Sequence, residues 1–182
     1  RTEAGKELIK LINNAENSID FAFYGLSHQD EIVNALVNAQ KRGVKVRGII
    51  DMTVFGNNHY PGTMEAVSKF YPNTIKNDYK TDLRKKELID KKEIPYTDSY
   101  IFKGNIMHHK FCVIDNKITW LGSMNISPTG TGGYNENVVL IVDSSNLANF
   151  YTKEMNQMYN NELFHENKEE IYSTSPLLIG KI

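Results

Sequence analysis

The first third of the chain alternates strand and helix signals, and this order restricts the fold more than any other feature. Residues 19–26, IDFAFYGL, and 44–52, VKVRGIIDM, are short apolar runs typical of buried strands. Between them, apolar residues recur at helical spacing over 29–42, and Gly43 follows as a helix stop. A strand, a helix and a strand in succession predict two parallel strands joined by a right-handed crossover helix.

Regular patterning returns in the second half of the chain, after weak signals from 53 to 105. We expect further helices over 5–18, over 63–71 and from Ser144 onward, and further strands over 108–115, 118–123 and 137–142. The two-residue turn Asn116-Lys117 should join two of these strands. The predicted fold class is α/β, a mixed, largely parallel sheet flanked by helices on both faces, in one domain over residues 1–182.

Composition and charge are those of an ordinary globular protein, with 40 % hydrophobic and 24 % charged residues in 182. The formal net charge of −1 gives no overall field that would gather a polyanion, so any nucleic-acid binding would depend on local basic patches. One such patch spans residues 79–93. Acidic residues alternate with its basic ones, which favours a solvated helix face.

The only cysteine is Cys112, so no intramolecular disulfide can form, and its apolar neighbours predict a buried side chain. No apolar run approaches the roughly 18 residues that a membrane span requires. The first ten residues also lack the profile of a signal peptide. We therefore expect a soluble chain. A leader removed from its start, a missing second half and a secreted or periplasmic location stay open.

The stretch NIMHHKFCVIDNKITWLGSMN, residues 105–125, combines two adjacent histidines and a lysine with an otherwise apolar strand. Residues at i and i+2 share a strand face, so His108 and Lys110 should lie together while His109 points to the other face. Adjacent strand residues diverge, which argues against a zinc site built on the histidine pair. His109 is expected to pack or hydrogen-bond locally.

A buried Lys110 would be costly unless an anion lies opposite it, which weakens the interpretation of His108 as a packed core residue. The next segment supplies Gly122, Ser123 and Asn125, small and polar residues at the end of a strand. A nucleophile, a fixed positive charge and neutral hydrogen-bond donors are the groups that a phosphoryl ligand requires. The sequence therefore predicts a phosphoryl site.

These residues follow the spacing HxKx4Dx6GS, which resembles the HKD motif of the phospholipase D superfamily. The matching positions are His108, Lys110, Asp115, Gly122 and Ser123, followed by Asn125. The residues MHHKF also resemble the Zucchini-type branch, and the single motif resembles small bacterial nucleases. The resemblance extends along the chain except for residues 53–105, and it implies a phospholipase D/nuclease-like fold.

The resemblance implies a mechanism that needs no metal or other cofactor. His108 attacks phosphorus and forms a phosphohistidine, which water or an alcohol then resolves. Lys110 neutralises the non-bridging oxygens, and Ser123 and Asn125 donate hydrogen bonds to them.

Two carboxylates complete the implied catalytic set. Glu136 matches the glutamate that accepts the second ring proton of the histidine in single-motif members. Asp115 is implied as a charge and hydrogen-bond support for the site. The candidate catalytic residues are thus His108, Lys110, Asp115 and Glu136.

The implied mechanism needs a general acid for the leaving oxygen, which the family takes from a second HKD motif. No other histidine in this sequence has a lysine two positions later. Either two chains pair as a homodimer so that each donates one His108, or the chain is one half of a longer tandem protein.

The superfamily cleaves nucleic acids, cleaves or transfers phospholipid groups, and includes members that only bind. Short, single-motif members are mostly nucleases, so the resemblance favours an endonuclease acting on DNA or RNA. A phospholipase D-type enzyme and a catalytically silent nucleic-acid-binding module are the alternatives. Tyr96, Tyr100 and Phe102 could stack on bases or simply occupy another strand.

Overall fold

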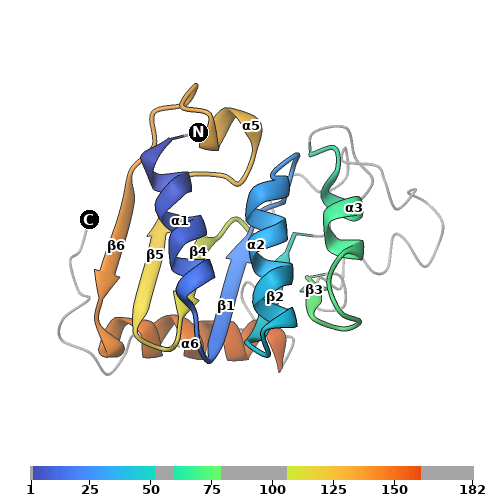
Figure 1. Ribbon diagram of the computed structural model, residues 1–182. Helices are drawn as coiled ribbons and strands as arrows, with labels where there is room; N and C mark the ends of the chain where they lie inside the picture. Colours follow the sequence, from blue (N-terminus) through green and yellow to red (C-terminus); the bar gives the residue numbers. More distant parts are fainter. Residues whose placement is uncertain (1, 52–59, 79–105, 161–182) are drawn as a thin grey trace.

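The computed structural model describes residues 2–51, 60–78 and 106–160. They form a six-stranded sheet with the order β3-β2-β1-β4-β5-β6, and helices cover both of its faces (Figure 1). The predicted mixed α/β architecture is confirmed. The basic patch at 79–93 and the aromatic residues at 96–102 lie outside the described residues.

The predicted elements occur in the predicted order, with boundaries shifted by a few residues, and the structure adds β3 and α5, which the sequence did not predict. The strands are β1 (Ser18–Phe23), β2 (Lys45–Ile50), β3 (Ile75–Asn77), β4 (Lys110–Ile114), β5 (Ile118–Gly122) and β6 (Val139–Asp143). The helices are α1 (Glu3–Asn14), α2 (Asp30–Lys41), α3 (Thr63–Ser68), α5 (Pro128–Thr131) and α6 (Ser145–Tyr159). Gly43 has a positive φ of 93° after α2, as its prediction as a helix stop requires.

The sheet has a parallel half and an antiparallel half. β1, β2 and β3 are parallel neighbours, whereas β4 pairs antiparallel with β1 and continues through antiparallel β5 and β6. The expectation of a largely parallel sheet therefore holds for the first half only. Parallel strands need long crossovers, while the short connection from β4 to β5 permits only an antiparallel pair.

Each face of the sheet packs against its own helices. Phe21 and Phe23 of β1 point toward α1 and α2, and Ala22 points toward α6. Figure 1 shows α1 and α2 in front of the strands and α6 crossing behind them. Cys112 is fully buried on the face of α1 and α2, which confirms its prediction as a core residue.

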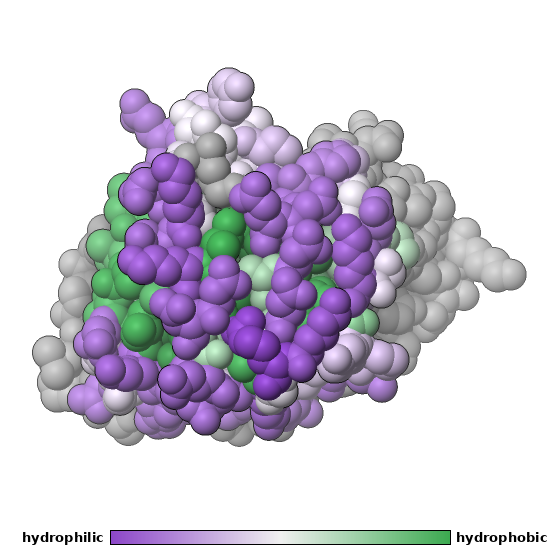
Figure 2. All heavy atoms as spheres, in the orientation of Figure 1, coloured by the Kyte–Doolittle hydropathy of each residue, from purple (hydrophilic) through white to green (hydrophobic). Residues whose placement is uncertain are grey.

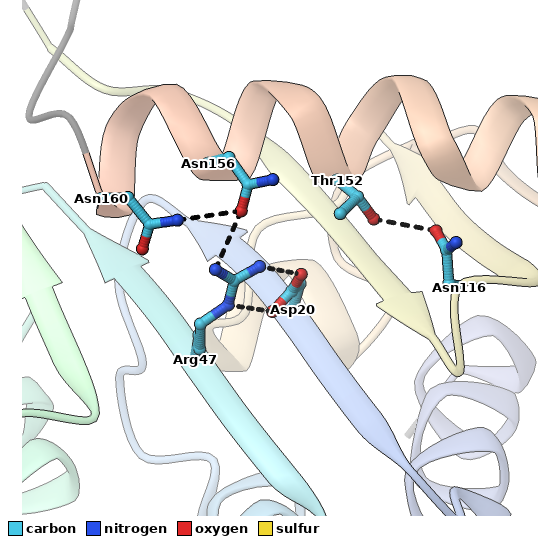
Figure 3. A network of polar contacts seen from close by, with 6 residues as sticks. All are labelled: Asp20, Arg47, Asn116, Thr152, Asn156 and Asn160. Atoms are coloured by element: carbon cyan, nitrogen blue, oxygen red, sulfur yellow. Dashed lines mark hydrogen bonds and ion pairs between the residues drawn. The ribbon is translucent and has the colours of Figure 1, made fainter.

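Polar contacts fasten α6 across the strands (Figure 3). Arg47 of β2 forms an ion pair with Asp20 of β1 at 2.5 Å and donates a hydrogen bond to Oδ1 of Asn156 at 2.9 Å. At the hairpin between β4 and β5, the hydroxyl of Thr152 donates to Oδ1 of Asn116 at 3.1 Å. These contacts fix the position of α6 relative to both halves of the sheet.

The hairpin turn begins one residue earlier than predicted. Asp115 and Asn116 both have positive φ, 52° and 50°, and the amide of Lys117 donates to the carbonyl of Ile114 at 3.0 Å. Two positive φ values are typical of a type I′ turn, whose twist matches that of the flanking strands. The central pair is therefore Asp115-Asn116, because both residue types tolerate the left-handed conformation.

The edge strand β6 exposes apolar side chains. Leu140 and Ile141 are 55 % and 44 % exposed, and Val138 just before the strand is 69 % exposed. Figure 2 shows this apolar surface at the left of the molecule, over β6. β6 is an edge strand among the described residues, and an edge strand with exposed apolar side chains is a surface suited to association with another chain.

The carboxylate of Asp115 joins the hairpin to the start of β1. Oδ1 accepts hydrogen bonds from the amides of Asn17 and Ser18 at 2.7 and 2.8 Å, and Oδ2 accepts from the amide of Glu16 at 3.0 Å. Partial burial acts to raise the pKa of Asp115, but the three amide donors outweigh it and the pKa is lowered.

We expect Asp115→Asn to lower the free energy of unfolding by about 1–3 kcal/mol at pH 7, because the charged acceptor of three amides is lost while the turn conformation is kept. The lowered pKa gives wild type a stability that is present above the usual carboxyl pKa of about 3.9 and lost as pH falls through the folded-state value. Urea unfolding at several pH values should show the variant and wild type converging in acid. A difference that stays constant from pH 7 to 3 would contradict this role.

Candidate active site

His108 and Lys110 lie at the amino end of β4, beside the end of β1. Lys110 is the first residue of β4 and pairs with Phe23, whereas His108 belongs to the irregular segment 106–109 that precedes the strand. Lys110 is 8 % exposed, and its Nζ donates a hydrogen bond to the backbone carbonyl of His108 at 2.7 Å. The structure thus brings the two residues together through a local hydrogen bond.

Tyr24, directly after β1, contacts both residues. Its ring stands edge-on to the imidazole of His108, with centroids 5.0 Å apart, and Nζ of Lys110 lies 5.9 Å from its centroid. Tyr60 stands edge-on to Tyr24 at 4.9 Å and lies so close over Gly25 that a Cβ there would be 2.6 Å from its ring. Sequence reasoning missed both tyrosines, although an aromatic residue at the end of an apolar strand was a signal.

Burial sets the electrostatics of this pair. His108 is exposed to solvent, but its partial burial by neighbouring groups, followed by the charge of Lys110 and then that of His109, lowers its pKa below the usual value. Burial also lowers the pKa of Lys110 to about 8. At neutral pH the imidazole of His108 is therefore neutral, while Lys110 is mostly charged in surroundings that disfavour the charge.

Ser123 and Asn125 follow β5 at the same end of the sheet, because β5 runs antiparallel to β4. The hydroxyl of Ser123 accepts from the amide of Val138 at 3.0 Å and donates to Oδ1 of Asn137 at 3.2 Å. Oδ1 of Asn125 is buried and accepts no hydrogen bond within the described ranges. The amide nitrogen of Asn125 carries two donors that could serve phosphate oxygens.

Glu136 is exposed and lies three residues before β6, which begins at Val139 rather than at 137. The antiparallel pairing of β6 with β5 brings this segment to the end of the sheet that holds Lys110. Among the residues whose placement is described, no hydrogen bond joins Glu136 to His108. Their contact stays a prediction.

Asp115 is separated from the other candidate residues. It follows the carboxyl end of β4, whereas Lys110 begins the strand, and five residues of strand span about 16 Å. Its carboxylate is occupied by three backbone amides. The structure therefore assigns Asp115 a role in the fold. The expectation that its charge supports the site directly does not agree with this position.

His109 points to the opposite face from His108, as predicted. Its Nε2 lies 3.0 Å from Oε1 of Glu154 on α6, and its ring stands edge-on to Phe111 at 5.5 Å. Sequence reasoning missed Glu154. It also missed Asp51, the buried residue after β2, whose Oδ2 accepts a hydrogen bond from the amide of Met107 at 2.5 Å.

Most of the chain matches a known protein family. Residues 8–159 match the family model described as cardiolipin synthase, PLD-like domain. The chain belongs to the phospholipase D superfamily. Membership confirms the resemblance drawn from the residues around His108 and places the chain in a superfamily of phosphodiesterases.

Curated members of the superfamily align with most of this chain. It is 31 % identical over 152 residues to a phospholipase D from Rickettsia prowazekii, which covers 81 % of the chain and 61 % of the relative. It is 32 % identical over 124 residues to cardiolipin synthase A from Proteus mirabilis, covering 63 % of the chain and 22 % of that protein. The chain thus spans about three fifths of the rickettsial relative's length.

Two solved superfamily structures align over most of both chains. Nuc from Salmonella typhimurium, described as a phospholipase D family member, has 26 % identity and a TM-score of 0.61 over 86 % of each chain. NucT from Helicobacter pylori has 26 % identity and a TM-score of 0.63, over 87 % of this chain and 88 % of that one. The predicted phospholipase D/nuclease-like fold is confirmed.

No described helix is long and apolar enough to cross a membrane.

We expect Tyr24→Ala to raise the pKa of His108 toward its usual value, because the ring that shields the imidazole is lost and burial is the main cause of the shift. Tyr24→Phe keeps the ring and should leave the pKa unchanged. The measurement is an NMR titration of the histidine Cε1–H signals, with His108→Asn identifying the His108 signal. Identical titration of wild type and both variants would refute the shielding role of Tyr24.

Proposed function

We propose that this chain is a phosphodiesterase that cleaves DNA or RNA without a metal, through a covalent phosphohistidine on His108. The observation that carries the proposal is the placement of the buried Lys110 beside His108, with Nζ 2.7 Å from the His108 carbonyl and both side chains against the ring of Tyr24. The lowered pKa of His108, which favours a neutral imidazole, supports it. A neutral imidazole can attack phosphorus, and a desolvated cation attracts the charge that develops on the phosphate oxygens.

In the proposed first step, a ring nitrogen of His108 bonds to phosphorus while the bond from phosphorus to the leaving oxygen breaks. Lys110 neutralises the non-bridging oxygens, and Asn125 is a further donor. Ser123 becomes a donor when its hydroxyl proton turns from Asn137 to the substrate, and Glu136 accepts the second ring proton of His108. The leaving oxygen takes a proton from a general acid. Water, giving its proton back to that group, then attacks phosphorus and releases His108.

We propose that the general acid is the His108 of a second copy in a homodimer. This second imidazole must carry a proton while the attacking one is neutral, so the two His108 residues of the pair differ in protonation. The alignment with Nuc and NucT, which covers nearly equal shares of both chains, supports a unit of this size. The exposed apolar edge of β6, which begins beside Ser123, offers a surface for pairing near the site. The longer curated relatives support the alternative, in which a second half of a tandem protein supplies the histidine.

Nucleic acid is the proposed substrate because short, single-motif members of the superfamily are mostly nucleases. The relatives named phospholipase D and cardiolipin synthase A favour a second candidate, a lipid phosphodiesterase or transphosphatidylase. The same histidine chemistry would serve either substrate, so substrate assays decide between them.

The wild-type protein should degrade single- or double-stranded nucleic acid in the presence of EDTA. His108→Asn should lower the rate by about a thousandfold or more, because the nucleophile is lost. His28→Asn is the matched control, since His28 is exposed and asparagine tolerates its φ of 47°.

Four outcomes would count against parts of this proposal. Cleavage that requires magnesium, or that survives His108→Asn, would overturn the mechanism. Hydrolysis of phosphatidylcholine vesicles with no cleavage of DNA or RNA would select the lipid candidate. Full activity of a strict monomer in light scattering would exclude the pairing of two His108 residues.

Anion binding should depend on the protonation of Lys110. Tungstate, whose charge is constant above neutral pH, should bind with constant affinity below pH 8 and about tenfold more weakly per pH unit above it, because the free protein loses the Lys110 proton there. Lys110→Arg should keep the affinity level to higher pH, since its guanidinium stays charged. Calorimetric titration measures both. An affinity for wild type that is unchanged from pH 7 to 9.5 would contradict the role of Lys110.

A further inference from the structure

The backbone that carries His108 is not held by the sheet. Residues 106–109 are irregular, and the ladder of β4 starts only at Lys110. A nucleophile must nevertheless be held within about half an ångström of its productive position. Contacts other than strand pairing must therefore supply this restraint.

On the amino-terminal side of His108, the restraint comes from Asp51. This residue directly follows β2, is fully buried, and its Oδ2 accepts the hydrogen bond of the Met107 amide at 2.5 Å. The side chain of Met107 is itself 3 % exposed and packs in the core beneath α6. The residue before His108 is thus fixed through both its backbone and its side chain.

On the carboxyl-terminal side, the restraint comes from Glu154. Its carboxylate, 8 % exposed, lies 3.0 Å from Nε2 of His109. The His109 ring also stands against Phe111, which packs on Tyr151 of α6 with centroids 4.8 Å apart. The residue after His108 is therefore fixed to a helix on the far side of the sheet.

We propose that Asp51 and Glu154 are positioning residues that hold the backbone on either side of His108 for attack on phosphorus. Neither touches His108 itself, so the imidazole stays available to the substrate. A buried carboxylate is costly unless it is paired, and each of these is paired to the residue next to the nucleophile in the chain. The inference rests on the proposed function, in which His108 is the nucleophile.

The central test compares two substitutions of Glu154. Glu154→Leu removes the acceptor and should lower kcat about 10- to 100-fold with KM changed less than about twofold, because small displacements of a reacting group act on the chemical step. Glu154→Gln retains an oxygen that accepts the His109 N–H and should recover most of kcat. Asp51→Leu and Asp51→Asn should show the same contrast.

Asp20→Asn is the matched control for stability. It breaks the buried ion pair with Arg47 beneath the same helix, without touching residues 106–109. Its unfolding midpoint should fall while kcat, measured well below that midpoint, stays unchanged. If Glu154→Leu does not fold, the pair His109→Phe with Glu154→Leu replaces both hydrogen-bonding partners by apolar side chains, which is often nearly neutral for stability. Full kcat in that folded double variant, together with lowered NMR order parameters of the 107–109 amides, would overturn the proposal.

A second readout separates this inference from the proposed function. NMR order parameters of the 107–109 amides should fall in Glu154→Leu and Asp51→Leu and stay unchanged in Asp20→Asn, whether or not a substrate is known. Unchanged order parameters together with unchanged kcat would overturn the positioning role while His108→Asn remained inactive. If the order parameters fall in these variants but the wild-type protein cleaves no phosphodiester, the restraint on residues 107–109 is supported and the proposed function is rejected.

Discussion

The antiparallel pairing of β1 with β4 is the interaction on which the rest of the structure depends. It joins the parallel half of the sheet to the antiparallel half, with Phe23 opposite Lys110. Because the two strands run in opposite directions, the residues after β1 and those before β4 meet at one end of the sheet. Tyr24 therefore lies beside His108, while the Asp115 carboxylate fastens the same two strands at the other end.

Local patterns in the sequence predicted the elements well, because the buried stripe of a helix can be recognised within that helix. Leu8 and Ile12 of α1, and Met155 and Met158 of α6, are buried and lie at the spacing of one helix face. The sequence did not predict that the strands in the second half of the sheet run antiparallel. β1 and β4 are far apart in the chain, and nothing in the pattern of either strand specifies its partner or their relative direction.

The same difference between local patterns and long-range pairing explains which site residues the sequence predicted. Motif spacing identified His108 and Lys110, and strand alternation predicted the face of His109. Tyr24 and Glu154 could not be found this way, since only the pairing of β1 with β4 and the docking of α6 bring them to residues 108–110. Asp115 is the opposite case, a residue that belongs to the motif but lies away from the site. Five residues of extended strand separate it from Lys110, so the two residues lie at opposite ends of β4.

The carboxylates around this site bind neighbouring residues of the fold and do not neutralise the charge of Lys110. Asp51 and Glu154 are bonded to the neighbours of His108, and no carboxylate in the part of the chain that is described is bonded to Lys110. Because Lys110 is buried and no described carboxylate compensates for this, burial lowers the pKa of Lys110 to about 8. In the proposed mechanism, the non-bridging oxygens of a bound phosphodiester share one negative charge, and attack by the neutral imidazole raises the charge on these oxygens toward two in the five-coordinate transition state. The attraction to Lys110 is therefore greater in the transition state than in the ground state, and that difference is what accelerates a reaction.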